Sequence, residues 1–485
     1  NHLAESLDSL VDQLTERKSD KDIREKMKKK NLKGEATFKL LRAQSDQNTK
    51  KLIQSKLKNF LFEFEEFKDN EELIDLLAQK GIMFYKYMDN PAKFKETKLP
   101  PQELLVNDLN GETCSDEDYA RANRVFNLAK CPTLLDYYNL YLRQDVVLLA
   151  DVFENYRELL IAQYKLDPAN YITVQSLSWD AAFLYNKDQV ELITDYHSYT
   201  NYEGGIRGGI SMIAKHLSVA NHPRVPGYDE KQKHKYIVYL DENNLYGKCL
   251  SEPLPYSNIQ EINPSDLGEL KQAEAFIKNY QIIEDVHGLS DGFDLIVDLT
   301  IPPEVQDKTI DYPLCVENKL VADEDLSPLS KYHKEKFNVS SGKVKKLIGD
   351  FKPKKNYMCN IRTLQFYLNM GVQLDKIHSV TSYKQKAFLK RYVLNNQRLR
   401  KECKTDFEKS LYKMLNNAPY GKTMENVRDY VHFDLVNTNV QPEKIPKLTK
   451  TNNFKRYQIF SENFVGIERS YKTVRLNKPI QVGFV

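Results

Sequence analysis

The chain has 485 residues, of which 41% are hydrophobic and 29% charged, and its formal net charge is +3. This composition excludes a disordered chain, and the length predicts two to four domains. No apolar run is long enough to cross a bilayer. The six cysteines form no C-x-x-C pair, so neither a zinc site nor a disulfide framework is expected. We expect an intracellular protein without a membrane partner, in either the nucleus or the cytoplasm.

The first clear element is a long helix. The first thirty residues are polar and Lys-rich and predict helix and loop, whereas residues 134–165 carry apolar side chains at helical spacing over many turns. Within that helix Tyr141 and Asp145 are four residues apart and share a face. Such a carboxylate can hold a metal ion while the hydroxyl orients a water molecule. The alternative is that Tyr141 is an ordinary tyrosine on the surface of a helix, without a functional role.

A glycine-rich stretch follows at 201–215, "NYEGGIRGGISMIAK". Glycine permits a positive φ angle or the close approach of another backbone. The group Arg207, Gly208 and Gly209 leads towards the next apolar run.

That run is "YIVYL", residues 236–240, and it ends abruptly at Asp241. It predicts a buried strand whose last carboxylate is held rigidly at the edge of a cleft, where it suits Mg²⁺. The turn after it offers backbone N–H groups to a phosphate, and Tyr246 could stack on a sugar. A structural aspartate that caps the turn is the alternative.

Residues 252–355 predict a loop-rich region with short strands such as "FDLIVDLTIP", and a basic helix is expected at about 384–420. Residues 384–413 hold ten Lys or Arg against three acidic residues, which fits a local phosphate-binding surface. The helix would present one polar face that could bind a triphosphate and stack on a base. A solvated amphipathic helix is the alternative. The residues of that face are Lys401, Lys409, Lys413, Asn417 and Tyr420.

Four stretches together resemble the motifs of family B DNA polymerases, in the order of that family. "YLRQD" is similar to the third exonuclease motif, and "GIRGGIS" to the glycine linker motif. "DENNLYG" resembles motif A, and "KMLNNAPYG" resembles motif B. The long insertion between motifs A and B resembles the protein-primed branch, which serves linear phages, linear plasmids, viruses and mobile elements.

The resemblance implies an α/β (α+β) fold, with a right-hand polymerase palm and fingers preceded by the C-terminal part of an RNase H-like 3′–5′ exonuclease domain. The last stretch, "PIQVGFV", is expected as a strand. The implied segments are the exonuclease part at 1–165, a linker at 166–235, motif A at 236–255, an insertion resembling a terminal-protein region at 256–355, palm and fingers with motif B at 356–430, and a second insertion with a truncated palm at 431–485.

The resemblance also implies roles. Asp241 would ligate two catalytic Mg²⁺ ions in the polymerase centre, and Asp145 a metal in the exonuclease centre beside Tyr141. Leu245 would support the triphosphate, Tyr246 would reject a ribose, and Lys401, Lys409 and Lys413 would bind phosphates. Asn417 and Tyr420 would line the nascent base pair, and Arg207, Gly208 and Gly209 would contact template DNA. The implied partners are template-primer DNA, deoxynucleoside triphosphates and a terminal protein.

The sequence departs from the family at the second carboxylates. No D-T-D motif follows Tyr420, and a D-x-E motif would have to precede residue 1. We therefore expect a central fragment of a polymerase, inactive by itself. The alternative is a non-catalytic remnant that binds nucleic acid or a partner protein. A reading frame that continues into D-T-D would favour the enzyme.

Overall fold

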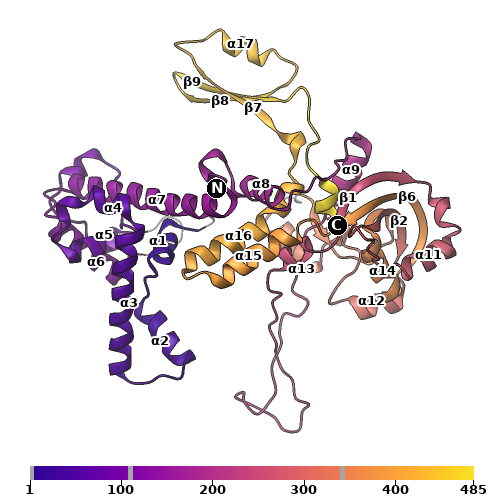
Figure 1. The fold of residues 1–485 in the computed structure, drawn as a ribbon, viewed down its shortest axis with the longest axis horizontal. Helices are drawn as coiled ribbons and strands as arrows, with labels where there is room; N and C mark the ends of the chain where they lie inside the picture. Colours follow the sequence, from indigo (N-terminus) through magenta and orange to yellow (C-terminus); the bar gives the residue numbers. More distant parts are fainter. Residues whose placement is uncertain (1–4, 107–112, 339–343) are drawn as a thin grey trace. The chain divides into compact units, whose positions relative to one another are not determined.

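The computed structural model describes residues 5–106, 113–338 and 344–485 (Figure 1). The chain forms two compact units that interleave along the sequence. Unit 1 comprises Asn1–Tyr185 and Leu394–Ala418, and unit 2 comprises Asn186–Val393 and Pro419–Val485. Among the helices of the described ranges, none is long and apolar enough to cross a membrane.

Unit 1 is built from helices that pack around α7 (Leu134–Tyr164) (Figure 1). Thr133 and Asp136 form a capping box at its start, and Lys165 ends it in the left-handed conformation. Leu148, Val152 and Tyr156 recur at helical spacing and are fully buried. The predicted long helix is therefore confirmed. Besides most of α15 and α16, described below, the described part of unit 1 includes α1 (Leu7–Thr15), α2 (Asp20–Lys29), α3 (Glu35–Lys56), α4 (Lys58–Glu63), α5 (Glu71–Leu77), α6 (Asp116–Leu128) and most of α8 (Val174–Asn186).

The prediction of one basic helix over 384–420 is wrong. Strand β6 (Gln373–Lys386) takes its first residues, and two helices follow, α15 (Lys390–Glu402) and α16 (Asp406–Thr423). The helices are separated because Thr405 and Glu408 form a new helix start. The Glu408 N–H donates to Thr405 Oγ1 at 3.2 Å, and the Thr405 N–H donates to the Glu408 carboxylate at 3.5 Å.

Helix α16 contains a proline, Pro419, inside its last turns. Proline has no N–H to donate to the carbonyl four residues earlier, which is that of Leu415. The hydroxyl of Ser178 donates to this carbonyl at 2.8 Å, and Ser178 is itself fully buried. Within unit 1, α8 therefore stabilises the helix that carries the motif B residues.

The main sheet of unit 2 has four antiparallel strands in the order β1-β6-β2-β5. Residues Leu295, Val297 and Leu299 of β2 alternate onto one face, where they join a core with α11 and α14. Met358 lies on the opposite face, in a core with α9 and α18. The elements are α9 (Tyr196–Gly205), β1 (Leu254–Ile262), α11 (Leu270–Lys278), β2 (Ser290–Thr300), α12 (Pro303–Thr309), β5 (Lys354–Asn360), α14 (Ile361–Met370) and α18 (Ile480–Phe484).

The range expected to be loop-rich, 252–355, contains more regular structure than predicted, although the strand-like run at 293–300 is confirmed as part of β2. Two small sheets complete unit 2. One pairs β3 (Glu317–Lys319) with β4 (Lys346–Ile348), near α13 (Pro328–Lys336) in sequence. The other has the order β7-β9-β8 and packs on α17; its elements are β7 (Val431–Asn437), α17 (Lys444–Thr449), β8 (Phe454–Ser461) and β9 (Phe464–Ser470).

The final stretch is a helix, α18, and not the predicted strand. Its residue Phe484 packs at right angles to Tyr202 of α9, with ring centroids 5.3 Å apart. Gly205 allows this contact, because a Cβ atom there would lie 2.8 Å from the Phe484 ring. Packing against α9 therefore decides the conformation of a short apolar run that sequence alone leaves ambiguous.

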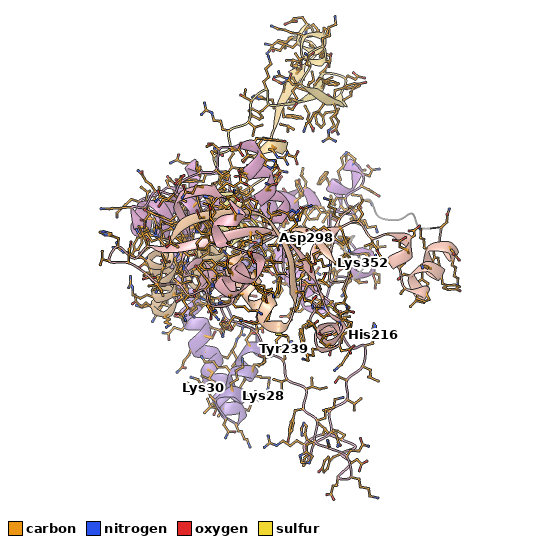
Figure 2. The ribbon with its side chains drawn as sticks, turned by 90° about the vertical axis from the view of Figure 1, so that its right-hand side faces the viewer. Lys28, Lys30, His216, Tyr239, Asp298 and Lys352 are labelled. Carbon is orange, nitrogen blue, oxygen red and sulfur yellow. The ribbon has the colours of Figure 1, made fainter. Side chains whose placement is uncertain are left out.

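The predicted buried strand at 236–240 is also absent. These residues belong to an extended loop, 206–244, in which Asn221 and Lys235 form an isolated bridge. Tyr239 is 90% exposed and Leu240 is 85% exposed (Figure 2, Tyr239). A strand requires a neighbour for its backbone groups, and no described segment pairs with 236–240.

Candidate functional site

The motif A segment forms a turn and a short helix in unit 2. Asn244 adopts the left-handed conformation, with φ of 59°, and α10 (Leu245–Leu250) starts directly after it. The side chain of Asn244 folds over Gly247, so that a Cβ atom on Gly247 would overlap it. The residues at these positions therefore fit one another, and they leave the Leu245 and Tyr246 side chains exposed.

Tyr246 contacts Tyr420, the tyrosine of the motif B segment. The ring centroids are 5.1 Å apart and the ring planes are inclined by 46°. Both residues belong to unit 2. Burial raises the pKa of the Tyr420 hydroxyl, with a further contribution from Tyr246. Two residues assigned to one nucleotide site from separate motifs thus lie side by side.

Asp241, three residues before the left-handed turn, is exposed. Within the described ranges, no side chain or backbone N–H donates to its carboxylate. The adjacent Glu242 differs, because it pairs with Lys248 at 3.0 Å. Asp241 is thus a carboxylate without an internal partner in the described chain, and it precedes Tyr246 in the same motif A segment.

The polar face of α16 carries Lys409, Lys413 and Asn417, as predicted, although Lys401 belongs to α15. These four residues lie in unit 1, and Tyr420 of the same helix lies in unit 2. Lys409 donates to Asp406 at 2.9 Å, so its ammonium group already has a carboxylate partner. Lys413 is exposed, and no ion pair to it occurs in the described residues.

The glycine segment follows α9 in unit 2. Arg207 donates to the carbonyl of Met358 at 2.8 Å, and its guanidinium lies 3.8 Å from the centre of the Tyr357 ring. Gly208 and Gly209 are exposed, and a Cβ atom on either would meet nothing within 4 Å. Neither glycine is therefore required by packing inside the described chain.

The exonuclease-like pair lies in unit 1, on α7. The Tyr141 hydroxyl donates to Asp145 Oδ2 at 2.8 Å, so the two side chains lie on one helix face, as their spacing predicts. Tyr85 Oη lies 2.6 Å from the same hydroxyl. Burial, followed by these two hydrogen bonds, raises the pKa of Tyr141 well above its usual value. The other oxygen, Asp145 Oδ1, is buried and accepts no hydrogen bond from the described residues.

A buried carboxylate oxygen without a donor suits a cation, so Asp145 fits the role of one metal ligand. Asp241 fits the same role because its carboxylate is exposed and unpaired among the described residues. Neither has the full ligand set: across the described ranges, no group of three His, Cys, Asp or Glu is placed to hold a metal ion. Neither site therefore has three such ligands among the described residues.

Two features were missed from the sequence. Tyr85 reaches Tyr141 from far along the chain, and no local pattern signals that contact. The second feature is a buried cluster around Asp294, which accepts hydrogen bonds from Tyr202 at 2.8 Å, Asn360 at 2.9 Å and Tyr383 at 3.1 Å. A polar residue inside the strand-like run "FDLIVDL" was the available signal.

The chain resembles Phi29 DNA polymerase in structure. The ternary complex of that enzyme with primer-template DNA and incoming nucleotide substrates has 14% sequence identity and a TM-score of 0.37, over 84% of this chain and 54% of that one. An orthorhombic crystal form of Phi29 DNA polymerase has 13% sequence identity and a TM-score of 0.38, over 81% of this chain and 52% of that one. The chain thus spans about half the length of these polymerases. No family model and no curated protein sequence matches it.

Proposed function

We propose that this chain is the central part of a template-dependent DNA polymerase, primed by a terminal protein and proofread by a 3′–5′ exonuclease. The observation that carries the proposal is the contact between Tyr246 and Tyr420, at 5.1 Å between ring centroids. The two motifs that would share a nucleotide are far apart in sequence. Their tyrosines nevertheless meet within one unit, at a surface that an incoming nucleotide could reach.

In this proposal Asp241 is the polymerase carboxylate that would hold Mg²⁺. Two bound ions would supply the chemistry, one for activation of the primer hydroxyl and one for the leaving pyrophosphate. Tyr246 packs against the deoxyribose and excludes a 2′-hydroxyl, while Tyr420 borders the base. Leu245 is the first residue of α10, and its role is to support the triphosphate of the nucleotide. For unit 1 the proposal gives Lys413, Lys401 and Lys409 the role of binding phosphates, because lysines stabilise the charge that develops on phosphoryl oxygens. Asn417 has the role of bordering the nascent base pair.

The exonuclease role rests on Tyr141 and Asp145. The Tyr141 hydroxyl fixes Asp145 Oδ2 at 2.8 Å, which leaves the buried Oδ1 to face a cation. The linker role rests on Gly208 and Gly209. Their open surroundings would let a template backbone approach the chain closely.

The second candidate is a non-catalytic protein that binds nucleic acid or a partner. It is favoured because no group of three metal-ligating side chains occurs at either site in the described residues. In that case the basic surfaces keep their role in binding, whereas no nucleotide is added.

Primer extension with template-primer DNA, deoxynucleotides and Mg²⁺ tests the proposal, on this chain and on the protein encoded by the reading frame that contains it. Asp241→Asn should reduce incorporation by about 100- to 1,000-fold or more, because a group aimed at the transition state is lost. Glu242→Gln, next to it, should leave incorporation almost unchanged. Equal activity in Asp241→Asn and the parent would overturn the assignment. DNA binding without extension in the complete protein would favour the second candidate.

A further inference from the structure

A concentration of unpaired positive charge lies outside every motif discussed above. Residues 17–33 hold nine Lys or Arg and three acidic residues. They include α2 and the turn after it, where Lys28 and Lys30 are labelled in Figure 2. We name the group Lys26, Lys28, Lys29, Lys30 and Lys33 the basic α2 surface. All five side chains are exposed.

The acidic residues of this segment do not neutralise the basic α2 surface. Asp20 pairs with Arg42 at 3.1 Å. Asp22 forms the capping box with Ser19, and those hydrogen bonds lower the pKa of its carboxyl group. No ion pair joins an acidic residue of the described chain to any of the five lysines. The five ammonium groups therefore have no ion-pair partner among the described residues, although Asp22 and Glu25 line the same surface hollow as three of them.

The lysines are held on a fixed support. Ile23 and Met27 of α2 are buried in a small core with Phe38 of α3. Beside this core the surface is hollowed by about 380 Å³, and the charged residues that line the hollow are Lys18, Lys26, Lys29 and Lys30 together with Asp22 and Glu25. The packing fixes which way the helix faces, and Lys26, Lys29 and Lys30 therefore meet at one hollow.

Folding alone does not explain this arrangement. Lysines in the last turn of a helix interact favourably with its dipole, but Lys30 and Lys33 lie beyond the end of α2. The five lysines all lie within residues 26–33, and like charges this close together repel one another. A bound polyanion would remove that repulsion.

We propose that the basic α2 surface binds the sugar-phosphate backbone of nucleic acid, without regard to base sequence. Phosphates recur at short intervals along the backbone, and lysines displace their counterions on binding. A membrane surface fits less well, because the apolar residues of α2 are buried and cannot insert into lipid. The inference does not depend on nucleotide addition, since it concerns equilibrium binding at a surface apart from the proposed catalytic residues.

The test is the affinity of the full chain for a short fluorescent DNA duplex, measured by anisotropy over a salt series without nucleotides. The triple variant Lys26→Gln, Lys29→Gln, Lys30→Gln should bind at least about tenfold more weakly, with a slope of log K against log salt that is smaller by about 2 to 3. The control, Lys51→Gln, Lys58→Gln, Lys98→Gln, changes the charge equally at dispersed exposed positions. It should keep nearly the parent slope.

Circular dichroism of each variant shows whether the fold is retained, and the exposed positions predict that it is. An unchanged slope in the α2 variant would overturn the inference, as would equal losses in both variants. Vesicles of phosphatidylcholine and phosphatidylserine serve as the second probe. Loss of vesicle binding with unchanged duplex binding would also overturn the inference, in favour of a lipid surface. A failure of primer extension would leave all of these binding outcomes unaffected.

Discussion

Tyr246 and Tyr420 lie with their ring centroids 5.1 Å apart, one at the start of α10 and the other near the end of α16. The Tyr420 ring restricts the orientation of the Tyr246 ring, which remains partly exposed to solvent. An aromatic ring held by a second ring is a suitable surface for discrimination by shape.

We predict that Tyr246→Val weakens the discrimination between deoxynucleotides and ribonucleotides by about tenfold or more, because a rigid ring that excludes a hydroxyl is replaced by a small side chain. The measurement is the ratio of the affinities for a fluorescent deoxynucleotide and its ribonucleotide counterpart. Tyr246→Phe keeps the ring and should keep the ratio. If valine and phenylalanine variants behaved alike, Tyr246 would not be the residue that tests the sugar.

Tyr141→Phe should destabilise the chain by about 1–3 kcal/mol, because a carboxylate oxygen of Asp145 then loses its donor in a largely buried place. Urea denaturation measures the change. Tyr138→Phe, on the same helix, serves as the control, because its ring contacts Phe94 and that contact survives the change. If Tyr141 positions the exonuclease carboxylate, Tyr141→Phe in the complete protein also reduces 3′–5′ degradation more than synthesis. Equal effects on both activities would contradict that role.

Asp294 predicts a pH dependence of stability. The pKa of Asp294 is raised to about 7 because the effect of burial is larger than the opposite effect of its hydrogen bonds. Those hydrogen bonds come from Asn360, Tyr202 and Tyr383. The folded chain therefore holds a proton that the unfolded chain releases near pH 4, so stability falls as the pH rises from about 4 to 7 and is constant above that. The contribution is up to about 4 kcal/mol, from about three pH units at 1.36 kcal/mol each.

Asp294→Asn removes that titration and preserves the shape of the side chain. We expect the variant to show a flatter dependence of the urea midpoint on pH, with its largest advantage over the parent above pH 7. Asp12 contributes a slope of the same sign, since burial raises its pKa to about 6. The difference between parent and variant isolates Asp294. Parallel curves for the two proteins would contradict the assignment.

The exposed run at 236–240 predicts self-association. Five consecutive apolar residues of high strand propensity, without a pairing partner in the described chain, form a template for edge-to-edge pairing. Val238→Lys with Leu240→Lys should raise the concentration at which light scattering begins. The control, Ser211→Lys with Ser218→Lys, adds the same charge to exposed positions of the same loop. An equal gain in the control would show that net charge, and not the apolar run, sets the solubility.

Local patterns predicted the local features well. The periodicity of 134–165 predicted α7, and the spacing of Tyr141 and Asp145 predicted that they share a helix face. The break before α16 was also readable, because Thr405 and Glu408 match the capping-box pattern. For the contact between Tyr246 and Tyr420, the sequence offered only the motif resemblance, which assigns both tyrosines to one nucleotide site.

Features that depend on distant partners were not predictable. The run at 236–240 has the composition of a strand, yet a strand forms only where another segment offers its backbone groups. The run at 480–484 is short and apolar, and contact with α9 makes it a helix. The Asp294 cluster joins α9, β2, β5 and β6, which only the folded chain brings together.

The interleaving of the two units limits how this protein can be taken apart. Unit 1 includes residues 394–418, which come from the second half of the chain. A fragment cut at residue 185 would lose Asn396, to which the Tyr164 hydroxyl donates, and Asp406, which pairs with Lys18 at 3.1 Å. A fragment spanning 186–393 would lack the α18 helix that covers α9. Separate production of either half therefore calls for a circular permutation or a two-chain complementation, rather than a single truncation.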